Sequence, residues 1–279
     1  MIREASEQDI PQLKQLFKVC FGDTDAFLDL FFTEYFPNTT CMVAIRDERI
    51  ASMLFLCPAK MMDEDSLRLL YYVYACGTLP EYRQLGIMDQ LLQISHAFAK
   101  QQDAWGLLLV PANEHLSTYY GRLGFVPFSY SVKEKMTPVV YDEEMEIVKT
   151  CKLSLRQVVY IRNRQFKSHY QVRWSQKHIA FTIAMLQQQG GGYFGLQWNN
   201  GRKDYLLYEK RKGELIVRET SVEENLLPWL TPLLCRHFKV ISVQYFVSAA
   251  EGDLFAMVKP VDNFEVQDNS EPYFNLEMA

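Results

Sequence analysis

Apolar positions along the chain follow two spacings, and these predict the order of helices and strands. Apolar residues at i, i+3, i+4 and i+7 predict helices, and short uncharged apolar runs predict buried strands. In the first half they predict a strand at 2–5, helices over 13–20 and 24–35, strands at 42–45, 50–57 and 71–78, a helix from about 84, a strand at 105–110 and a helix at 113–124, after which the segment 125–136 closes the first unit. This order favours an α+β fold in which helices flank a mixed, largely antiparallel sheet.

The second half repeats that order. We expect helices at 154–165 and 175–189, strands at 193–198, 204–209 and 214–219, a helix at 223–238 and strands at 240–247 and 254–258. A length of 279 residues exceeds the usual ~100–200 of one domain. The sequence therefore predicts a first domain at 1–136, a charged connector at 137–152 and a second domain at 153–279.

Composition excludes several classes of protein. A formal net charge of −5 argues against a nucleic-acid binder that relies on a general positive field. No apolar run approaches the ~18 residues of a membrane span, and the N-terminus does not read as a signal peptide, so we expect a cytoplasmic protein that binds no membrane. The six cysteines form no C-x-x-C pair and the five histidines no H-E-x-x-H, so no metal site is expected.

The stretch from Tyr71 to Leu92 carries the strongest chemical signal. An uncharged strand to Thr78 is followed within a few residues by a helix. A tight join of this kind leaves the first N–H groups of the helix without partners, at the positive end of its dipole. Gly86 would let a phosphate approach the backbone, and Arg83 adds a permanent positive charge. The pattern therefore predicts an anion site.

The six residues at this join resemble a family motif. Arg83, Gln84, Leu85, Gly86, Ile87 and Met88 look like the acyl-CoA pyrophosphate loop of the GNAT N-acetyltransferase superfamily, in which the last position is Gly or Ala. Met88 departs from that pattern, because it keeps the backbone N–H and adds bulk. The resemblance implies that the amides of these residues, with Arg83, bind acetyl-CoA as co-substrate.

A second motif follows about thirty residues later. In the superfamily an asparagine opens a helix beside the pantetheine arm, and a tyrosine ahead of a Gly-Phe pair points at the thioester sulfur. Asn113, Tyr120, Gly124 and Phe125 match that spacing. The resemblance implies that Tyr120 is the general acid, and that the backbone of Cys76, Gly77 and Thr78 pairs with the pantetheine arm. The predicted reaction is direct attack of a primary amine on acetyl-CoA.

An aromatic stripe on the second predicted helix has two interpretations. Phe27, Phe31 and Tyr35 recur at helical spacing, which is more often typical of a core than of a ligand pocket. In the superfamily, however, the first two helices border the acceptor site, so these residues are also predicted to contact the acceptor. The acceptor is a small-molecule or peptide amine that the sequence does not identify further.

The second half lacks the anion loop. Its equivalent join reads Thr220-Ser221-Val222-Glu223-Glu224-Asn225, without glycine or arginine and with two carboxylates that repel phosphate. A catalytic first unit with a degenerate second one is similar to the enhanced-intracellular-survival type of acetyltransferase. In those enzymes the C-terminal carboxylate is the base, which here implies Ala279, with Glu114 or His115 as substitutes.

Other functions compete with this prediction. A GNAT-like domain could sense acyl-CoA or scaffold a partner without turnover, although a sensor needs no proton donor at Tyr120. A long-chain acyl or aminoacyl transferase would need a wide apolar channel. The segment 162–177 interleaves basic and aromatic residues as single-stranded nucleic-acid binders do, but an amphipathic helix and loop is the preferred interpretation. The sequence leaves open whether the chain forms a homo-oligomer.

Overall fold

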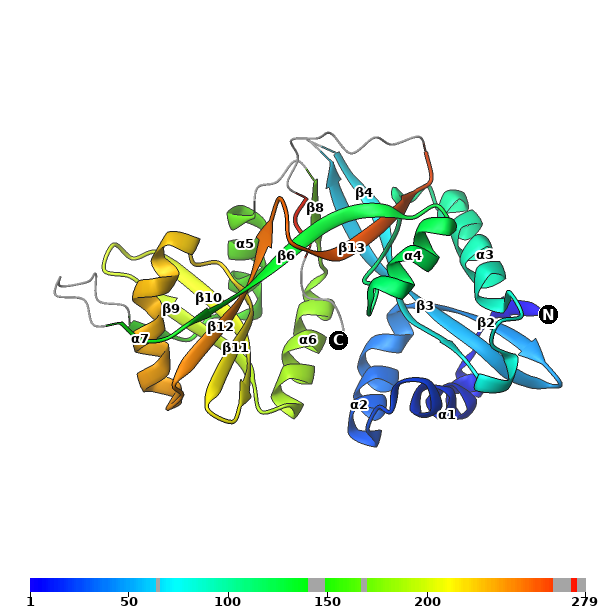
Figure 1. Ribbon diagram of the computed structural model, residues 1–279, viewed down its shortest axis with the longest axis horizontal. Helices are drawn as coiled ribbons and strands as arrows, with labels where there is room; N and C mark the ends of the chain where they lie inside the picture. The colour runs from blue at the N-terminus through cyan, green and yellow to red at the C-terminus, as the bar shows by residue number, and fades with distance from the viewer. Residues whose placement is uncertain (64–65, 140–148, 167–169, 263–271, 275–279) are drawn as a thin grey trace. The chain divides into compact units, whose positions relative to one another are not determined.

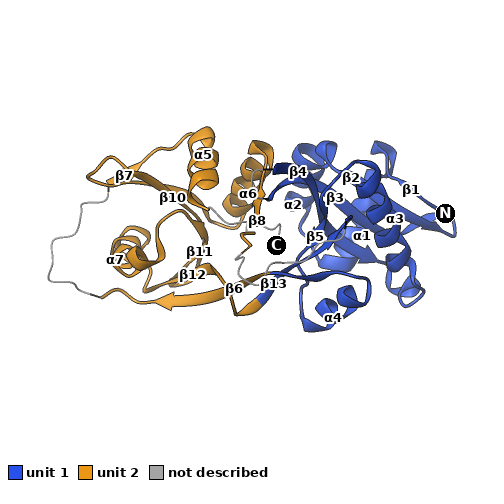
Figure 2. Ribbon diagram, turned by 90° about the horizontal axis from the view of Figure 1, so that it is seen from above, with its two compact units in different colours: residues 1–128, 254–270 blue, residues 129–253, 271–279 orange. Residues whose placement is uncertain are grey.

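A computed structural model describes residues 1–63, 66–139, 149–166, 170–262 and 272–274 (Figure 1). The chain divides into two compact units, coloured in Figure 2. Unit 1 contains residues 1–128 and 254–270, and unit 2 contains residues 129–253 and 271–279. No helix within the described ranges is long and apolar enough to cross a membrane.

Unit 1 is built on a mixed sheet with the strand order β1-β2-β3-β4-β5-β13. Only β4 and β5 run parallel, and the other neighbours are antiparallel. Its strands are β1 (Ile2–Glu4), β2 (Thr40–Arg46), β3 (Arg49–Asp63), β4 (Ser66–Thr78), β5 (Gly106–Leu109) and β13 (Asp253–Pro260). Its helices are α1 (Ile10–Phe21), α2 (Asp25–Leu30), α3 (Ile87–Gln101) and α4 (Glu114–Arg122).

Helices cover both faces of this sheet (Figure 1). On one face α1 and the segment after α2 pack an aromatic cluster around Phe17, Phe31 and Phe55, whose ring centroids lie 5.2–5.5 Å apart. On the other face α3 and α4 bury Leu91 and Tyr120 against the alternate side chains of β3 and β4. The sheet is therefore apolar on both faces, as its uncharged central strands predict.

The predicted helix over 24–35 is only partly regular. Thr24 caps α2 by accepting a hydrogen bond from the N–H of Phe27, and from Phe31 to Tyr35 the helix widens into a π-helical turn. Five aromatic residues fall within 27–36, and three of them, Phe31, Phe32 and Phe36, pack face to edge against each other or against Phe55. The π-helical turn therefore lies where these bulky rings pack against the sheet.

Unit 2 repeats the strand pattern of unit 1. Its sheet has the order β6-β12-β11-β10-β9-β7, and here only β12 and β11 run parallel. Its strands are β6 (Val126–Met136), β7 (Lys149–Cys151), β9 (Gly192–Gln197), β10 (Lys203–Arg211), β11 (Glu214–Thr220) and β12 (Ser242–Ala249), with β8 (Tyr170–Arg173) outside that order. Its helices are α5 (Leu155–Gln165), α6 (Gln176–Gln188) and α7 (Leu227–Phe238).

The unit boundaries differ from the expected ones in two places. Residues 129–136 belong to unit 2, because β6 pairs with β12 from Tyr130 to Met136. Residues 254–270 belong to unit 1, because β13 pairs with β5. One cut at a connector cannot separate the two units, because a late segment of the chain belongs to unit 1. Strand pairing places it there, and the paired residues of β13 and β5 lie about 150 residues apart along the chain.

A buried polar network lies inside unit 2. Arg162 is 0% exposed, and its Nε lies 3.1 and 3.2 Å from the two carboxylate oxygens of Glu219. The phenols of Tyr205 and Tyr273 donate to the same carboxylate at 2.5 and 2.8 Å. Tyr273 also pairs with β8 through its backbone, so this network fixes a segment near the C-terminal end of the chain.

Candidate active site

A cleft of about 610 Å³ opens in unit 1 where β4 ends and α3 begins. That volume lies within the ~300–1,000 Å³ typical of small-molecule sites. The end of α1, the end of β4, the loop before α3, and α4 supply its walls, with Cys20, Phe21, Cys76, Gly77, Thr78, Tyr82, Arg83, Gln84, Gly86, Ile87, Met88, Asp89, His115, Leu116, Tyr119 and Tyr120 as lining residues. The structure thus brings the first motif, apart from Leu85, and Tyr120 of the second motif into one cleft.

The loop before α3 has a backbone shaped to present N–H groups. Gln84 and Gly86 both adopt left-handed conformations, with φ of 63° and 67°. Among the described residues, no backbone or side-chain acceptor receives the N–H groups from 84 to 89, and the first intrahelical bond runs from Gln90 to Gly86. These donors lie at the positive end of the α3 dipole, which is the arrangement that binds phosphate groups.

Arg83 and Met88 flank these amides in different ways. The Nε of Arg83 donates to the carbonyl of Thr78 at 3.0 Å, which holds the guanidinium beside the cleft. Met88 is half-buried and packs against the apolar core of unit 1, while it also borders the cleft. The side chain of Met88, which departs from the family pattern, therefore packs partly in the core of unit 1. Its backbone N–H remains in the first turn of α3.

A bulge in β4 opens the sheet next to the loop. Met53 pairs with Gly77 and Phe55 with Tyr74, so Ala75 and Cys76 stand opposite the single residue Leu54. Ala75 has a φ of 50°, an unfavourable value for a residue with a side chain. Pairing of β4 with the parallel strand β5 ends at Tyr72 and Leu108. Beyond that point one edge of β4 faces the cleft, where an extended chain could add as a further strand.

Tyr120 and Cys76 meet at this edge. Tyr120 is 7% exposed, and its phenol and the thiol of Cys76 lie close enough to influence each other's pKa. Burial raises the pKa of the Tyr120 phenol above its usual value, and the neighbouring thiol raises it further. Burial also raises the pKa of Cys76, to about 12. Both groups therefore stay protonated near neutral pH, so Tyr120 has a proton to donate and Cys76 is not a thiolate.

Three further polar groups in or beside the cleft belong to neither motif, so no sequence pattern marks them. The phenol of Tyr119 donates to the carboxylate of Asp89 at 2.5 Å, and both residues line the cleft. Asp23 follows the lining residue Phe21 by two positions, is half-buried and makes no hydrogen bond or ion pair with a described residue. Burial raises the pKa of the Asp23 carboxyl. An unpaired carboxylate here is suited to meet an ammonium group.

Several predicted site residues lie elsewhere. The side chain of Asn113 accepts a hydrogen bond from the N–H of Leu116 at 3.0 Å, which confirms it as the cap of α4 but places it outside the cleft lining. Leu85 is 62% exposed, so only its backbone can serve the anion site. Phe27, Phe31 and Tyr35 are buried in the aromatic cluster of unit 1 and do not line this cleft. Their contact with an acceptor stays a prediction.

The substitutes for the base have different surroundings. His115 lines the cleft from the first turn of α4, whereas Glu114 is exposed and outside its lining. Ala279 lies outside the described residues. Within the described ranges, no three His, Cys, Asp or Glu side chains gather closely enough to hold a metal ion.

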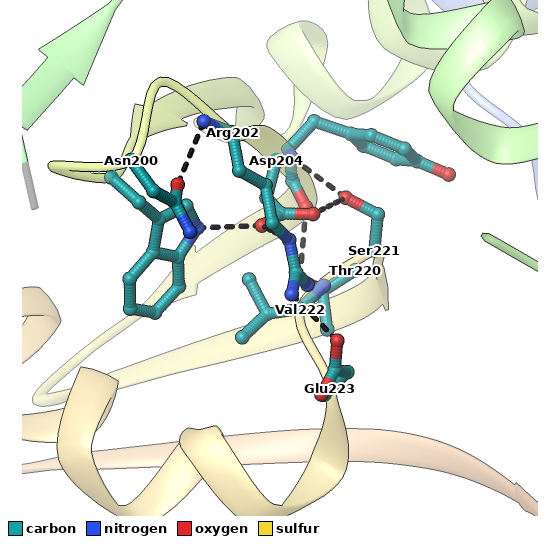
Figure 3. Close-up of polar contacts among 9 residues, drawn as sticks. Asn200, Arg202, Asp204, Thr220, Ser221, Val222 and Glu223 are labelled. Atoms are coloured by element: carbon teal, nitrogen blue, oxygen red, sulfur yellow. Dashed lines mark hydrogen bonds and ion pairs between the residues drawn. The ribbon is translucent and has the colours of Figure 1, made fainter.

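The equivalent join in unit 2, between β11 and α7, is filled by its own side chains (Figure 3). Arg202 lies between Asp204 and Glu223, with nitrogen–oxygen distances of 2.9 and 2.6 Å. The N–H groups of Ser221 and Val222 are used by Tyr205 and Thr220 of the same unit. The arginine near this join is thus paired with two carboxylates, and the amides of Ser221 and Val222 are already bonded, which leaves less for an anion to bind than in unit 1.

The fold and the cleft define an acyltransferase domain of the GNAT type, and the comparisons agree. Residues 1–128 match the model of the acetyltransferase (GNAT) domain. This part of the chain, to which the cleft and its two motifs belong, is therefore a GNAT acetyltransferase domain. No curated protein matches the chain.

Solved structures extend the likeness in fold to both units. The chain is similar to a probable N-acyltransferase of unknown function from Enterococcus faecalis, with a TM-score of 0.76 and 15% identity over 94% of this chain and 72% of that one. It is similar to a GCN5-related N-acetyltransferase from Anabaena variabilis, with a TM-score of 0.74 and 16% identity over 94% and 73%. Eis1 from Mycobacterium abscessus gives 0.65 and 11% over 94% and 74%.

Proposed function

We propose that this protein is an N-acetyltransferase that moves an acetyl group from acetyl-CoA to a primary amine. One observation supports this most directly: a loop with unpaired amides and a buried, protonated tyrosine line the same cleft. The first suits the pyrophosphate of CoA, and the second suits a departing thiolate. Acetyl-CoA supplies the acetyl group as an activated thioester.

We assign different parts of the reaction to different residues of the cleft. The amides of residues 84–88 and Arg83 bind the anionic half of CoA, and the free edge of β4 at Cys76, Gly77 and Thr78 orients the pantetheine arm. Tyr120 donates its phenolic proton to the sulfur while the nitrogen of the acceptor displaces that sulfur from the acetyl carbon. The phenol then regains a proton from solvent. Cys76 packs under Tyr120 and is no nucleophile, because burial keeps it a thiol.

The proton that the amine loses needs an acceptor. We propose the carboxylate of Ala279 for this role, with His115 and Glu114 as substitutes. Deletion of the last three residues tests the assignment. If the deletion lowers turnover most strongly below the pKa of the amine, Ala279 is the base; unchanged turnover at every pH transfers the role to one of the substitutes.

Thiol release from acetyl-CoA tests the reaction itself. The acceptors are aminoglycosides, polyamines and peptide N-termini, and wild type is compared with Tyr120→Phe. Loss of the phenol should lower turnover at least tenfold, about 1.4 kcal/mol of transition-state stabilisation. Tyr160→Phe is the matched control, because Tyr160 is 60% exposed on α5 of unit 2 and should leave turnover unchanged.

The same experiment separates the second candidate function. Binding of acetyl-CoA without turnover on any amine would identify an acyl-CoA sensor, for which the partly filled last position of the loop, at Met88, is the supporting observation. A chain that does not bind acetyl-CoA at all would overturn both proposals.

A further inference from the structure

The cleft contains a hydrogen bond between Tyr119 and Asp89 that the proposed reaction does not use. Asp89 is the third residue of α3, so its carboxylate lies in the same first turn as the unpaired amides. The phenol of Tyr119, on α4, donates to that carboxylate at 2.5 Å. Both side chains are half-buried and both line the cleft. A hydrogen bond thus joins the helix that begins at the anion site to the helix that carries the proton donor.

The position of Asp89 has a consequence for an anionic ligand. A carboxylate in the first turn is stabilised by the helix dipole and by nearby N–H groups. A pyrophosphate bound to the same amides would compete with the carboxylate for that stabilisation and would be repelled by its charge. The hydrogen bond from Tyr119 reduces both effects, because it gives the carboxylate a donor that is independent of the amides.

Tyr119 also contacts the proton donor. Its ring centroid lies 5.2 Å from that of Tyr120, and the Tyr120 ring also packs against Phe125 at 5.8 Å. The hydroxyl of Tyr120 meets Cys76. The position of Tyr120 therefore depends on two ring neighbours and one thiol, and one of those rings is held by Asp89.

We propose that Asp89 and Tyr119 form a latch that couples binding of the anionic half of CoA to the placement of Tyr120. Both are positioning residues, since neither is required to touch the reacting atoms. The proposal rests on the proposed function, because it assigns the pyrophosphate to the amides at the start of α3. It adds that Tyr119 keeps the charge of Asp89 from opposing that ligand and keeps Tyr120 in place for the thioester.

Three variants separate the two roles of the latch. Tyr119→Phe keeps the ring and removes the donor, so the affinity for CoA should fall about tenfold and kcat should fall as well. Asp89→Asn keeps an oxygen that accepts from Tyr119 and removes the charge, so the affinity should stay within twofold of wild type or rise. The double variant lacks both donor and charge, so the affinity should recover while kcat stays low.

CoA itself is the probe, because its binding can be measured by calorimetry without turnover. Thermal unfolding of each variant establishes that it is folded, and Tyr193→Phe, which removes a phenol hydrogen bond to Leu153 in unit 2, is the matched control. Equal affinities for CoA in wild type and Tyr119→Phe would overturn the latch, as would a double variant that binds as weakly as Tyr119→Phe alone. If wild type itself does not bind CoA, the proposed function has failed first, and the latch fails with it.

Discussion

Gly86 offers the sharpest test of the anion loop, because two costs of replacing it can be measured separately. Its φ is 67°, and a Cβ built on it meets no atom within 4 Å. Gly86→Ala should therefore create no clash in the free protein. Its cost in stability is the left-handed backbone alone, about 1–2 kcal/mol for a residue with a side chain. For a protein of this size that corresponds to a fall in Tm of roughly 2–8 °C.

The second cost appears only with ligand present. The space beside Gly86 belongs to the cleft, and a methyl group there would occupy the approach of a phosphate to the amides of 84–88. We expect the Kd for CoA to rise at least tenfold. Calorimetry with CoA and thermal unfolding of the free protein measure the two costs on the same preparations.

Gly190 supplies the matched control. It follows α6 in unit 2, has a φ of 78° and likewise has no atom within 4 Å of a built Cβ. Gly190→Ala should lower Tm by a similar amount and leave the Kd for CoA unchanged. If both variants lose stability and both bind CoA as wild type does, the loop before α3 does not hold the pyrophosphate.

Three further predictions concern charged groups. Arg3 holds the pKa of Asp9 well below its usual value through a hydrogen bond, so Asp9→Asn should destabilise the protein near pH 7. The ionised carboxylate stabilises the folded state above its unfolded-state pKa, and this stabilisation is lost as the pH falls through the lowered folded-state pKa, so denaturant unfolding should show a smaller difference between Asp9→Asn and wild type at pH 2 than at pH 7. Arg162→Met should cost about 3–5 kcal/mol in the free energy of unfolding, because it leaves the carboxylate of Glu219 buried without its cation; a loss under 1 kcal/mol would contradict this. Asp23→Asn should remove an acidic limb from the pH profile of kcat/KM, because burial raises the pKa of that carboxyl above its usual value; an unaltered profile would exclude Asp23 from acceptor binding.

Local patterns in the sequence determined most of the site. The uncharged run to Thr78, the turn through Arg83 and Gly86 and the helical period after it are all short-range features, and the structure reproduces them as β4, the loop and α3. Asn113 was readable as a helix cap for the same reason, since capping involves a side chain and an N–H three residues later. The likeness of the two halves also came from the order of elements alone.

Tertiary structure decided the rest, because the remaining features depend on partners that are distant in the chain. Nothing in the local sequence marks Ala75 as left-handed, and its bulge arises from the register of β4 against β3. The bond between Tyr119 and Asp89 spans 30 residues. The assignment of residues 254–260 to unit 1 follows from pairing with β5. Hydrophobic period and turn chemistry act over a few residues, whereas strand register, burial and the pKa values that burial sets exist only once distant segments have packed together.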